Sequence, residues 1–173
     1  MRLLKRVESV EDEDNEIRVK VSKQIFNNVM SILLRVLVAY VLCTYVIAVA
    51  EVHGSSMNPT LYSGERVVLC KLMEPKNGDI AVFDFDGTML IKRVIAVPGD
   101  RLKIEDSTVY VNDVKVVENY INENEFTGGY FEGQEITLKD EEYFIMGDNR
   151  YNSKDSRMIG VMSKESLIGT KIF

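Results

Sequence analysis

The first strong pattern in the chain is an apolar run near its start. From Met30 to Ala50 there are twenty-one residues, and only Ser31, Arg35 and Thr44 among them are clearly polar. A helix needs about 20 apolar residues to cross the hydrocarbon layer of a membrane. The run therefore predicts a helix that spans a bilayer.

Charges around this run predict its orientation. Lys20 and Lys23 precede it, and Arg35 lies near its start, where a long cationic side chain can reach back to the lipid headgroups. Lys and Arg are enriched on the cytoplasmic side of membrane helices, so the N-terminus is expected in the cytoplasm and the body outside. The alternating charges of residues 1–23 predict a solvated or loosely helical segment. The expected organisation is a cytoplasmic tail at residues 1–28, a transmembrane anchor at residues 29–52 and an extracytoplasmic domain at residues 53–173.

A rival interpretation of the apolar run is a cleaved leader. Val36–Ile47 has the length of a signal-peptide core, and Ala48-Val49-Ala50 is a small-x-small pattern like a cleavage site. The flank before the run is long and carries no net charge, whereas a leader has a short basic one. A retained anchor is therefore preferred, both over a cleaved leader and over a buried helix of a soluble core.

After Val52 the pattern changes to short β-branched runs separated by turn residues. Asp86-Gly87 predicts a two-residue hairpin between two of these runs, because both residues can adopt the positive φ that such a turn requires. The other turn signals also separate neighbouring runs, so the sheet is expected to be mainly antiparallel. The polar segment 119–133 is expected to be an exposed excursion. The expected strands are residues 66–72, 79–85, 89–97, 101–105, 108–111, 114–117, 134–138, 143–146 and 166–172.

Composition excludes several classes of function. The formal net charge is −6 and lies beyond residue 28, and an acidic body argues against nucleic acid as a partner. Cys43 and Cys70 occur in unlike settings, which makes a disulfide improbable. His53 is the single histidine, so a catalytic zinc ion would have too few ligands. No metal or cofactor is expected.

A candidate nucleophile follows the apolar run, in the stretch Gly54-Ser55-Ser56-Met57-Asn58-Pro59-Thr60-Leu61. A serine hydroxyl is a weak nucleophile and needs an adjacent neutral base. His53 is more simply a residue at the membrane boundary. Lys92 lies within Leu90–Ile95, where apolar neighbours on a strand can bury its ammonium group. A pKa near 8 instead of about 10.4 corresponds to roughly 3 kcal/mol, which desolvation can supply. Lys92 on an exposed strand face is the alternative that these residues leave open.

Four blocks of the sequence resemble the motifs of bacterial type I signal peptidases. They are Ser55–Leu61, Gly64–Leu69, Ile91–Asp100 and Gly147–Arg157, and they stand in the family's order behind the apolar run. Read without the family, the last block is a polar turn, because Asp, Asn and Ser hydrogen-bond their own backbone. The resemblance identifies Ser56, directly before Met57, as the nucleophile in place of Ser55. It identifies Lys92 as the general base.

The resemblance also implies roles for supporting residues. Ser153 would hydrogen-bond and orient the Lys92 amine, while Asp155 and Arg157 would form an ion pair that holds the loop. Arg93 is expected to pack or pair structurally.

Met57 and Pro59 are expected to line the substrate cleft, and for Met57 the alternatives are insertion into lipid or packing as an apolar residue beside the serine. The resemblance makes the Ser56 backbone N–H a donor to the oxyanion. Some members of the family add a serine two residues before the nucleophile. That position is Gly54 here, so a second donor would come from the backbone or elsewhere.

The expected fold class is mainly β, an antiparallel β catalytic domain of the signal peptidase type with one N-terminal transmembrane helix. The resemblance implies a membrane serine endopeptidase that removes signal peptides from exported preproteins through an acyl-enzyme. Members of the family cut after small residues at the first and third positions before the scissile bond. Signal peptides and the lipid bilayer are the expected partners, the protein is expected to be a monomer, and no cofactor is implied.

Two rival functions are weighed against this one. A soluble, self-cleaving Ser-Lys regulator, similar to stress-response repressors, is disfavoured by the span Met30–Ala50. A non-enzymatic anchored β-module would have motifs that are only turns. Cleavage of the chain after Ala50 would leave Ser56 about 20 Å along an extended chain from the cut, so any self-processing is expected between molecules.

Overall fold

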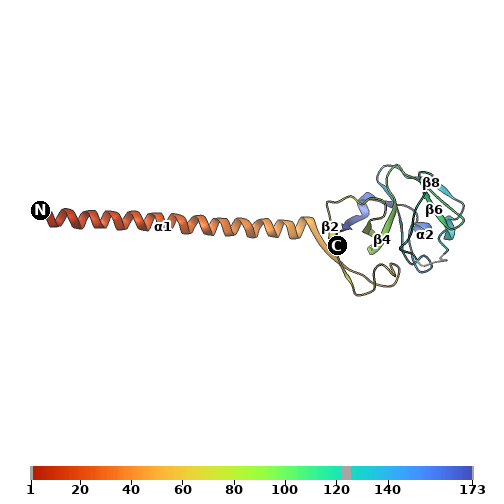
Figure 1. The fold of residues 1–173 in the computed structure, drawn as a ribbon, viewed down its shortest axis with the longest axis horizontal. Helices are drawn as coiled ribbons and strands as arrows, with labels where there is room; N and C mark the ends of the chain where they lie inside the picture. Colours follow the sequence, from red (N-terminus) through yellow and green to blue (C-terminus); the bar gives the residue numbers. More distant parts are fainter. Residues whose placement is uncertain (1, 122–125, 173) are drawn as a thin grey trace. The chain divides into compact units, whose positions relative to one another are not determined.

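The computed structural model describes residues 2–121 and 126–172, with side chains from residue 18 onward. The chain divides into two compact units, Met1–Tyr45 and Val46–Phe173. The first is a single long helix and the second is a body made mainly of β-strands (Figure 1).

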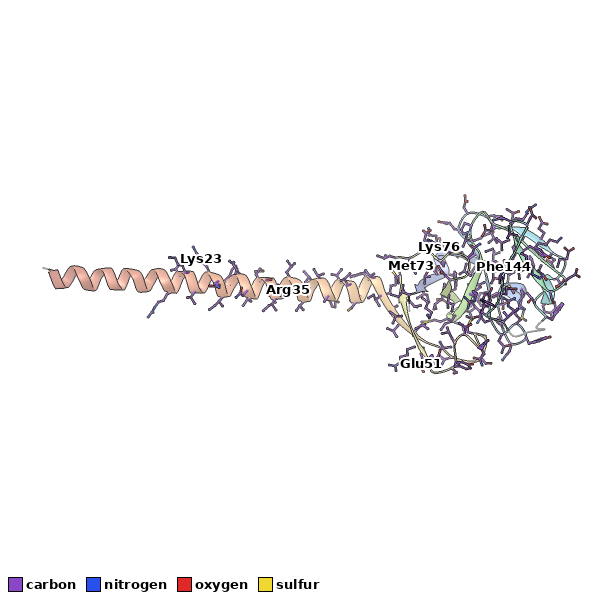
Figure 2. The ribbon with its side chains drawn as sticks, in the orientation of Figure 1. Lys23, Arg35, Glu51, Met73, Lys76 and Phe144 are labelled. Atoms are coloured by element: carbon purple, nitrogen blue, oxygen red, sulfur yellow. The ribbon has the colours of Figure 1, made fainter. Side chains whose placement is uncertain are left out.

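The first unit consists of helix α1, Arg2–Val41, which continues into a π-helical turn at Leu42–Val46. The segment Arg18–Val46 is long and apolar enough to cross a membrane, and none of it is buried within the protein. Lys23 and Arg35 lie along this segment (Figure 2). Its later part, residues 29–46, carries few polar side chains on any side, which suits a lipid environment. Residues 2–17, which precede this segment, are also helical, since α1 begins at Arg2.

The second unit contains two antiparallel sheets. The larger has the strand order β1-β2-β11-β3-β4-β9-β10, and the smaller has the order β7-β6-β5-β8. The strands of the larger sheet are β1 Ile47–Glu51, β2 Arg66–Cys70, β3 Ile80–Phe85, β4 Thr88–Ala96, β9 Glu142–Met146, β10 Met162–Ser163 and β11 Leu167–Lys171. Those of the smaller sheet are β5 Arg101–Glu105, β6 Thr108–Val111, β7 Val114–Lys115 and β8 Glu135–Thr137. Short helices occur at Gly129–Phe131 (η2), Ser156–Ile159 (α2) and Lys164–Ser166 (η3).

The nine strands expected from the sequence all occur, and the mainly antiparallel β class is confirmed. Strands β3 and β4 pair through the Asp86-Gly87 turn, where φ is +51° at Asp86 and +79° at Gly87. Strand β10, which has only two residues, was not expected. Short strands of this kind carry too few residues to show an alternating pattern.

The helical anchor expected over residues 29–52 ends earlier than predicted, because Ile47–Glu51 forms strand β1. All five residues of β1 pair with β2, from Ile47 opposite Cys70 to Glu51 opposite Arg66. Ala48 and Ala50 pack against the core, whereas the alternate residues of the strand are exposed. The β-branched residues of this stretch suit a strand as well as an apolar helix, and pairing with β2 decides between the two.

A buried apolar cluster holds together the two segments that carry the expected nucleophile and base. It contains Met57, next to Ser56, and Ile91, next to Lys92. Met57 is 1% exposed, and burying a side chain of this size stabilises a fold by about 1.5–3 kcal/mol. Two further clusters lie between and beneath the sheets, and Phe144 in one of them packs edge-on against Phe131.

The excursion at 119–133 is less exposed than the sequence predicted. Thr127 and Gly128 are buried, and Glu118 and Tyr120 at its start are half-buried. The segment packs against the loop that follows β9, a contact that no local pattern in the sequence announces. Residues 122–125 of the expected excursion lie outside the described residues.

Candidate active site

Ser56 lies in the turn that leaves β1, between the sheet edge and the buried Met57. Its backbone carbonyl accepts a hydrogen bond from the Asn149 amide at 3.0 Å, which ties the turn to the loop after β9. Gly54, two residues earlier, has φ +84°, a conformation in which a side chain is strained. The Ser56 side chain is therefore presented from a turn that is fixed on both sides.

Lys92 lies on β4 and is 4% exposed. Its Nζ donates to Ser56 Oγ at 2.7 Å and to the Ile91 carbonyl at 3.0 Å. Burial lowers the pKa of Lys92 to about 8, against the opposing charges of Asp155 and Asp148. An amine with a lowered pKa is neutral in a larger fraction of molecules, and in contact with a serine hydroxyl the neutral form can act as a base toward it.

Asp155 organises the loop from Gly147 to Arg157, which carries the expected supporting residues Ser153, Asp155 and Arg157. Its carboxylate accepts the Gly147 amide at 2.9 Å and caps helix α2 at the Arg157 amide. Arg157 Nη2 lies 2.8 Å from Asp155 Oδ2, and both side chains are buried. Burial opposes the charge of Asp155, but the hydrogen bonds and charge of Arg157 outweigh it and hold the pKa of Asp155 below its ordinary value.

Ser153 differs from its expected arrangement. Its hydroxyl is buried and interacts with the Asp155 carboxylate, whose pKa it helps to lower, but the expected bond to the Lys92 amine is not formed here. The hydroxyl lies against Gly147, where an added Cβ would meet Ser153 Oγ at 2.3 Å and the Ser56 carbonyl oxygen at 2.5 Å. Gly147 therefore lets the Ser153 and Ser56 segments approach each other closely.

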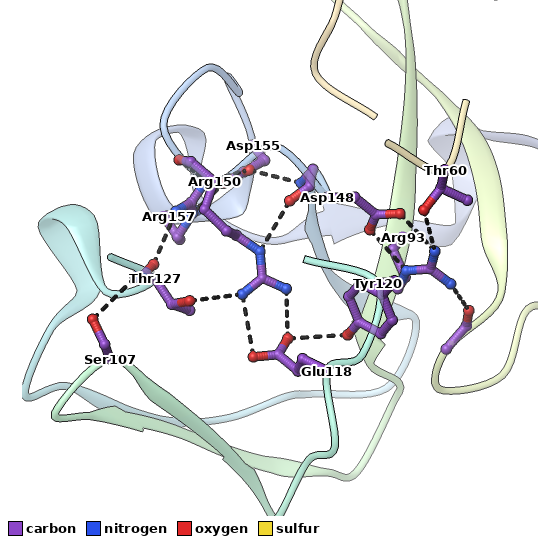
Figure 3. Close-up of polar contacts among 12 residues, drawn as sticks. Thr60, Arg93, Ser107, Glu118, Tyr120, Thr127, Asp148, Arg150, Asp155 and Arg157 are labelled. Carbon is purple, nitrogen blue, oxygen red and sulfur yellow. Dashed lines mark hydrogen bonds and ion pairs between the residues drawn. The ribbon is translucent and has the colours of Figure 1, made fainter. Parts of the chain in front are cut away.

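Arg93, adjacent to Lys92, forms a two-pronged ion pair with Asp148. Its Nε and Nη2 donate to the two Asp148 oxygens at 2.8 and 2.6 Å, and the Asp148 side chain is fully buried. Figure 3 shows this pair beside Tyr120 and the second arginine, Arg150. The sequence analysis gave Arg93 a structural role and did not single out Asp148, Asn149 or Gly147, because each acts through contacts with distant segments.

A cleft of about 680 Å³ opens beside Ser56 and Lys92. Its walls come from the end of β1 and the start of β4, and Met57 forms part of its lining. His53 lines the cleft and is exposed, whereas Pro59 is exposed and is not a lining residue. Of the two residues expected in a substrate cleft, the structure places Met57 in the lining of this cleft and Pro59 outside it.

The described residues contain no group of three or more His, Cys, Asp or Glu side chains that could hold a metal ion.

We predict that Lys92→Met stabilises the folded protein at neutral pH. A folded-state pKa of about 8 against an ordinary 10.5 corresponds to a cost of roughly 3 kcal/mol for carrying the charge in the folded state. Below pH 8 Lys92 is protonated in both the folded and the unfolded protein, so the full cost of burying its charge is present. This cost shrinks as pH rises from 8 to 10.5, because Lys92 in the folded protein has then lost its proton while Lys92 in the unfolded protein still holds one. Denaturant unfolding of the full chain in detergent micelles at pH 7 and pH 10 measures the difference.

Lys139→Met is the control for this measurement, because the Lys139 side chain is 84% exposed. It should change the unfolding free energy little at either pH. Equal stabilities of wild type and Lys92→Met at pH 7 would contradict the burial cost.

Comparison with known proteins gives a consistent result. A family model described as "Signal peptidase, peptidase S26" matches residues 25–173. Signal peptidase I of Bacillus licheniformis is 36% identical over 162 residues, which cover 86% of this chain and 87% of the relative. Signal peptidase I T of Bacillus subtilis (strain 168) is 35% identical over 156 residues, covering 83% and 81%. A crystal structure of a signal peptidase I from Enterococcus faecalis V583 has a TM-score of 0.47 and 29% identity, covering 56% of this chain and 96% of that chain.

The family model extends over most of the chain, from within the apolar helix to the last strand. Both Bacillus relatives exceed 30% identity over more than four fifths of their length. The chain therefore belongs to the signal peptidase family, peptidase S26, whose members are membrane-anchored serine endopeptidases that remove signal peptides from preproteins.

Proposed function

We propose that this signal peptidase cuts its substrates with a dyad in which Ser56 is the nucleophile and Lys92 the general base. The observation that carries the proposal is the 2.7 Å contact between Lys92 Nζ and Ser56 Oγ, made by a buried lysine whose pKa is about 8. At pH 7 about one lysine in ten with such a pKa is neutral, whereas an exposed lysine is almost fully charged. His53 is exposed and forms no such contact with Ser56 within the described part of the chain.

In the acylation step, neutral Lys92 takes the proton from Ser56 Oγ as the oxygen attacks the scissile carbonyl carbon. The tetrahedral intermediate collapses when the C–N bond breaks, and the Lys92 ammonium gives its proton to the leaving amine. That amine is the N-terminus of the mature protein. The signal peptide is left as an ester on Ser56 Oγ, and Lys92 is neutral again.

In the deacylation step, neutral Lys92 takes a proton from a water molecule that attacks the ester carbonyl. The C–O bond to Ser56 breaks, and the proton on Lys92 returns to Ser56 Oγ. The signal peptide departs with a free carboxylate. Each step needs the same amine in the same place, which the burial of Lys92 and its contact with the Ile91 carbonyl supply.

The Ser56 backbone N–H is proposed as one donor to the oxyanion of these intermediates. No described hydrogen bond occupies this N–H, since Ser56 contributes its carbonyl and its hydroxyl to the contacts around it. Losing one such donor costs about 2.7–4 kcal/mol of transition-state stabilisation. The glycine at position 54 adds no side-chain donor, so a second donor has to come from another group.

Ser153 is proposed to accept a hydrogen bond from the Lys92 ammonium that forms during the reaction. Its hydroxyl is buried, lies against Gly147 beside the Ser56 backbone, and interacts with the Asp155 carboxylate without meeting the geometry of a full hydrogen bond. A buried hydroxyl whose hydrogen bonding is incomplete calls for a functional explanation. Asp155, held by Arg157, is proposed to fix the loop that carries Ser153.

The cleft is proposed to bind the signal peptide as an extended strand. Strand β1 is an edge of the larger sheet, and in β4 the pairing with β9 begins only at Arg93. The free edges of β1 and of Thr88–Lys92 both border the cleft, so an extended peptide can pair with main-chain groups there. The apolar walls near Ser56 suit small apolar side chains at the cut.

We further propose that α1 spans the membrane with the N-terminus in the cytoplasm and the body outside. Lys20 and Lys23 lie at the N-terminal end of the segment Arg18–Val46, and cationic residues at that end favour this orientation. The arrangement is the proposed division into a tail at residues 1–28, an anchor from residue 29 and a catalytic body. Protease added outside intact spheroplasts should digest the body, and full protection of the body would contradict this orientation.

A monomer is proposed because one chain supplies both members of the dyad, and light scattering of the micellar protein tests it.

We expect Ser56→Ala and Lys92→Ala to abolish cleavage of a preprotein. Each variant removes one reacting group of the dyad, and losses of about 10⁴-fold or more are typical when such groups are deleted. The full chain in detergent micelles, a preprotein substrate and mass detection of the cut measure the effect. Ser55→Ala, one position earlier, is the matched control and should retain most activity. Wild-type cleavage by either dyad variant would overturn the assignment.

We predict that Gly147→Ala reduces cleavage by about 100-fold or more, because displacement of a reacting group by about 1 Å has that effect. The added Cβ would lie 2.5 Å from the Ser56 carbonyl oxygen, so the nucleophile segment has to shift. Gly133→Ala is the control: Gly133 has φ +74° but open space around it, so backbone strain arises without a clash at the site. Equal activity of the two variants would contradict this prediction.

We also predict that the chain is not cut after Ala50 while it is folded. All five residues of β1 are paired with β2, and Ala48 and Ala50 pack on the core. The full chain should keep its mass during an incubation in which substrate is consumed. A free peptide with the sequence of residues 36–55 is the control, and it should be cut after Ala50. A new N-terminus at Glu51 on the folded chain would contradict the prediction.

A further inference from the structure

Tyr120, on the segment that follows β7, contacts two arginines of the catalytic region. The Arg93 guanidinium carbon lies 3.9 Å from the centre of the Tyr120 ring, and that of Arg150 lies 6.0 Å from it. A guanidinium group over an aromatic face is attracted by the ring electrons. Figure 3 shows Tyr120 with Arg93 on one side and Arg150 on the other.

Glu118 completes this contact from the same segment. It accepts the Tyr120 hydroxyl at 3.0 Å and both terminal nitrogens of Arg150, at 3.3 and 2.5 Å. The side chains of Glu118 and Arg150 are 8% and 0% exposed. Desolvation raises the pKa of Tyr120 far above its ordinary value, with the charge of Glu118 adding to the effect, so the phenol keeps its proton and remains a donor.

Arg150 connects these residues to the loop that carries Ser153 and Asp155. Its Nε donates to the Gly147 carbonyl at 3.0 Å, and its own carbonyl accepts Arg157 Nη2 at 2.9 Å. Thr127 bonds both arginines, through Oγ1 to Arg150 and through its carbonyl to Arg157, each at 2.9 Å. The loop is therefore held at its first residue, Gly147, and at its last, Arg157.

Arg93 connects Glu118 and Tyr120 to Lys92, the proposed base. It neighbours Lys92 on β4 and pairs with Asp148, the residue after Gly147. Without a fixed Arg93, the charge of Asp148 would act on Lys92 unopposed. Glu118 and Tyr120 thus contact both segments that the proposed dyad requires, although neither touches Ser56 or Lys92.

We propose that Glu118 and Tyr120 are positioning residues for cleavage, which hold Arg93 and Arg150 so that Lys92, Asp148 and the Gly147–Arg157 loop keep their places around Ser56. The proposal rests on the Ser56–Lys92 dyad. It gives the segment after β7 a part in the reaction, where the sequence alone predicted an exposed excursion.

The proposal differs from a purely structural role in its effect on the titration of Lys92. The charged groups around Lys92 are Asp148 and Asp155 on the loop, their partners Arg93 and Arg157, and Glu51, His53 and Lys154 on the cleft walls. Releasing Arg93 from Tyr120 weakens the neutralisation of Asp148 and admits water. Both changes favour the charged lysine, so the acid limb of the pH profile should move to higher pH.

The test compares Tyr120→Ala with wild type, as full chains in detergent micelles acting on a signal-peptide substrate. We expect kcat to fall by about 10-fold, while KM changes by less than about 2-fold because Tyr120 does not line the cleft. The acid limb of kcat/KM should move up by roughly half to one pH unit. Tyr120→Phe keeps the ring and should restore most of kcat and the position of the limb.

Tyr130→Ala is the matched control, because Tyr130 lies in the same segment and is 79% exposed. Its described hydrogen bond is made by its backbone carbonyl, which accepts from the Gln134 side chain and is kept in the variant. It should leave kcat and the limb unchanged. Should Tyr120→Ala fail to fold, Glu118→Gln tests the same proposal, with an expected loss of about 10-fold in kcat and an upward shift of the limb.

Two results would overturn the positioning role of Glu118 and Tyr120 while leaving the Ser56–Lys92 dyad intact. A variant with the wild-type kcat would do so, and so would a lower kcat that follows a loss of thermal stability while the acid limb stays in place. A wrong assignment of the dyad would give other results. The pH profile of the wild-type enzyme would then lack an acid limb near pH 8, or Ser56→Ala would still cut the substrate. In that case the positioning proposal fails with it.

Discussion

The body of this protein is built around a lysine amine that is kept out of water. Lys92 is 4% exposed, and its pKa of about 8 reflects a desolvation that the fold has to maintain. Two buried carboxylates lie close enough to Lys92 to oppose this effect. Each of them is paired with an arginine, Asp148 with Arg93 and Asp155 with Arg157. The acids can therefore organise the loop through hydrogen bonds while most of their charge is neutralised locally.

Close packing of backbone is the second requirement of the site. The Gly147 backbone lies against Ser153 and the Ser56 carbonyl, and the Asn149 amide bonds the same carbonyl. The loop and the nucleophile segment therefore have little freedom to move independently, since packed interiors have few alternative arrangements. Precise placement in this region comes from main-chain contacts, and these depend on side chains such as Arg150, which belongs to the loop and joins the Gly147 carbonyl to Glu118.

Sequence reasoning succeeded where the signal was local. Asp86-Gly87 predicted its hairpin, and the strand boundaries followed from β-branched runs and turn residues. It failed for Ile47–Glu51, because the same apolar residues suit a helix or a strand and the outcome depends on pairing with β2. The Glu118–Arg150 contact joins residues 32 positions apart, and neither belongs to a pattern that reveals the other. The motifs indicated Ser56 and Lys92, but the bond between Ser153 and Lys92 that they implied is not formed in this structure.

Strand β1 carries a sequence that resembles what the family cuts. Ala48 and Ala50 have the spacing of the small residues that precede a scissile bond, and they are locked into a paired strand with their side chains toward the core. We therefore expect such a protease to distinguish its own chain from a preprotein by conformation more than by residue identity. Its selectivity would then include a measure of foldedness, because a segment paired in a sheet cannot enter the cleft as an extended chain.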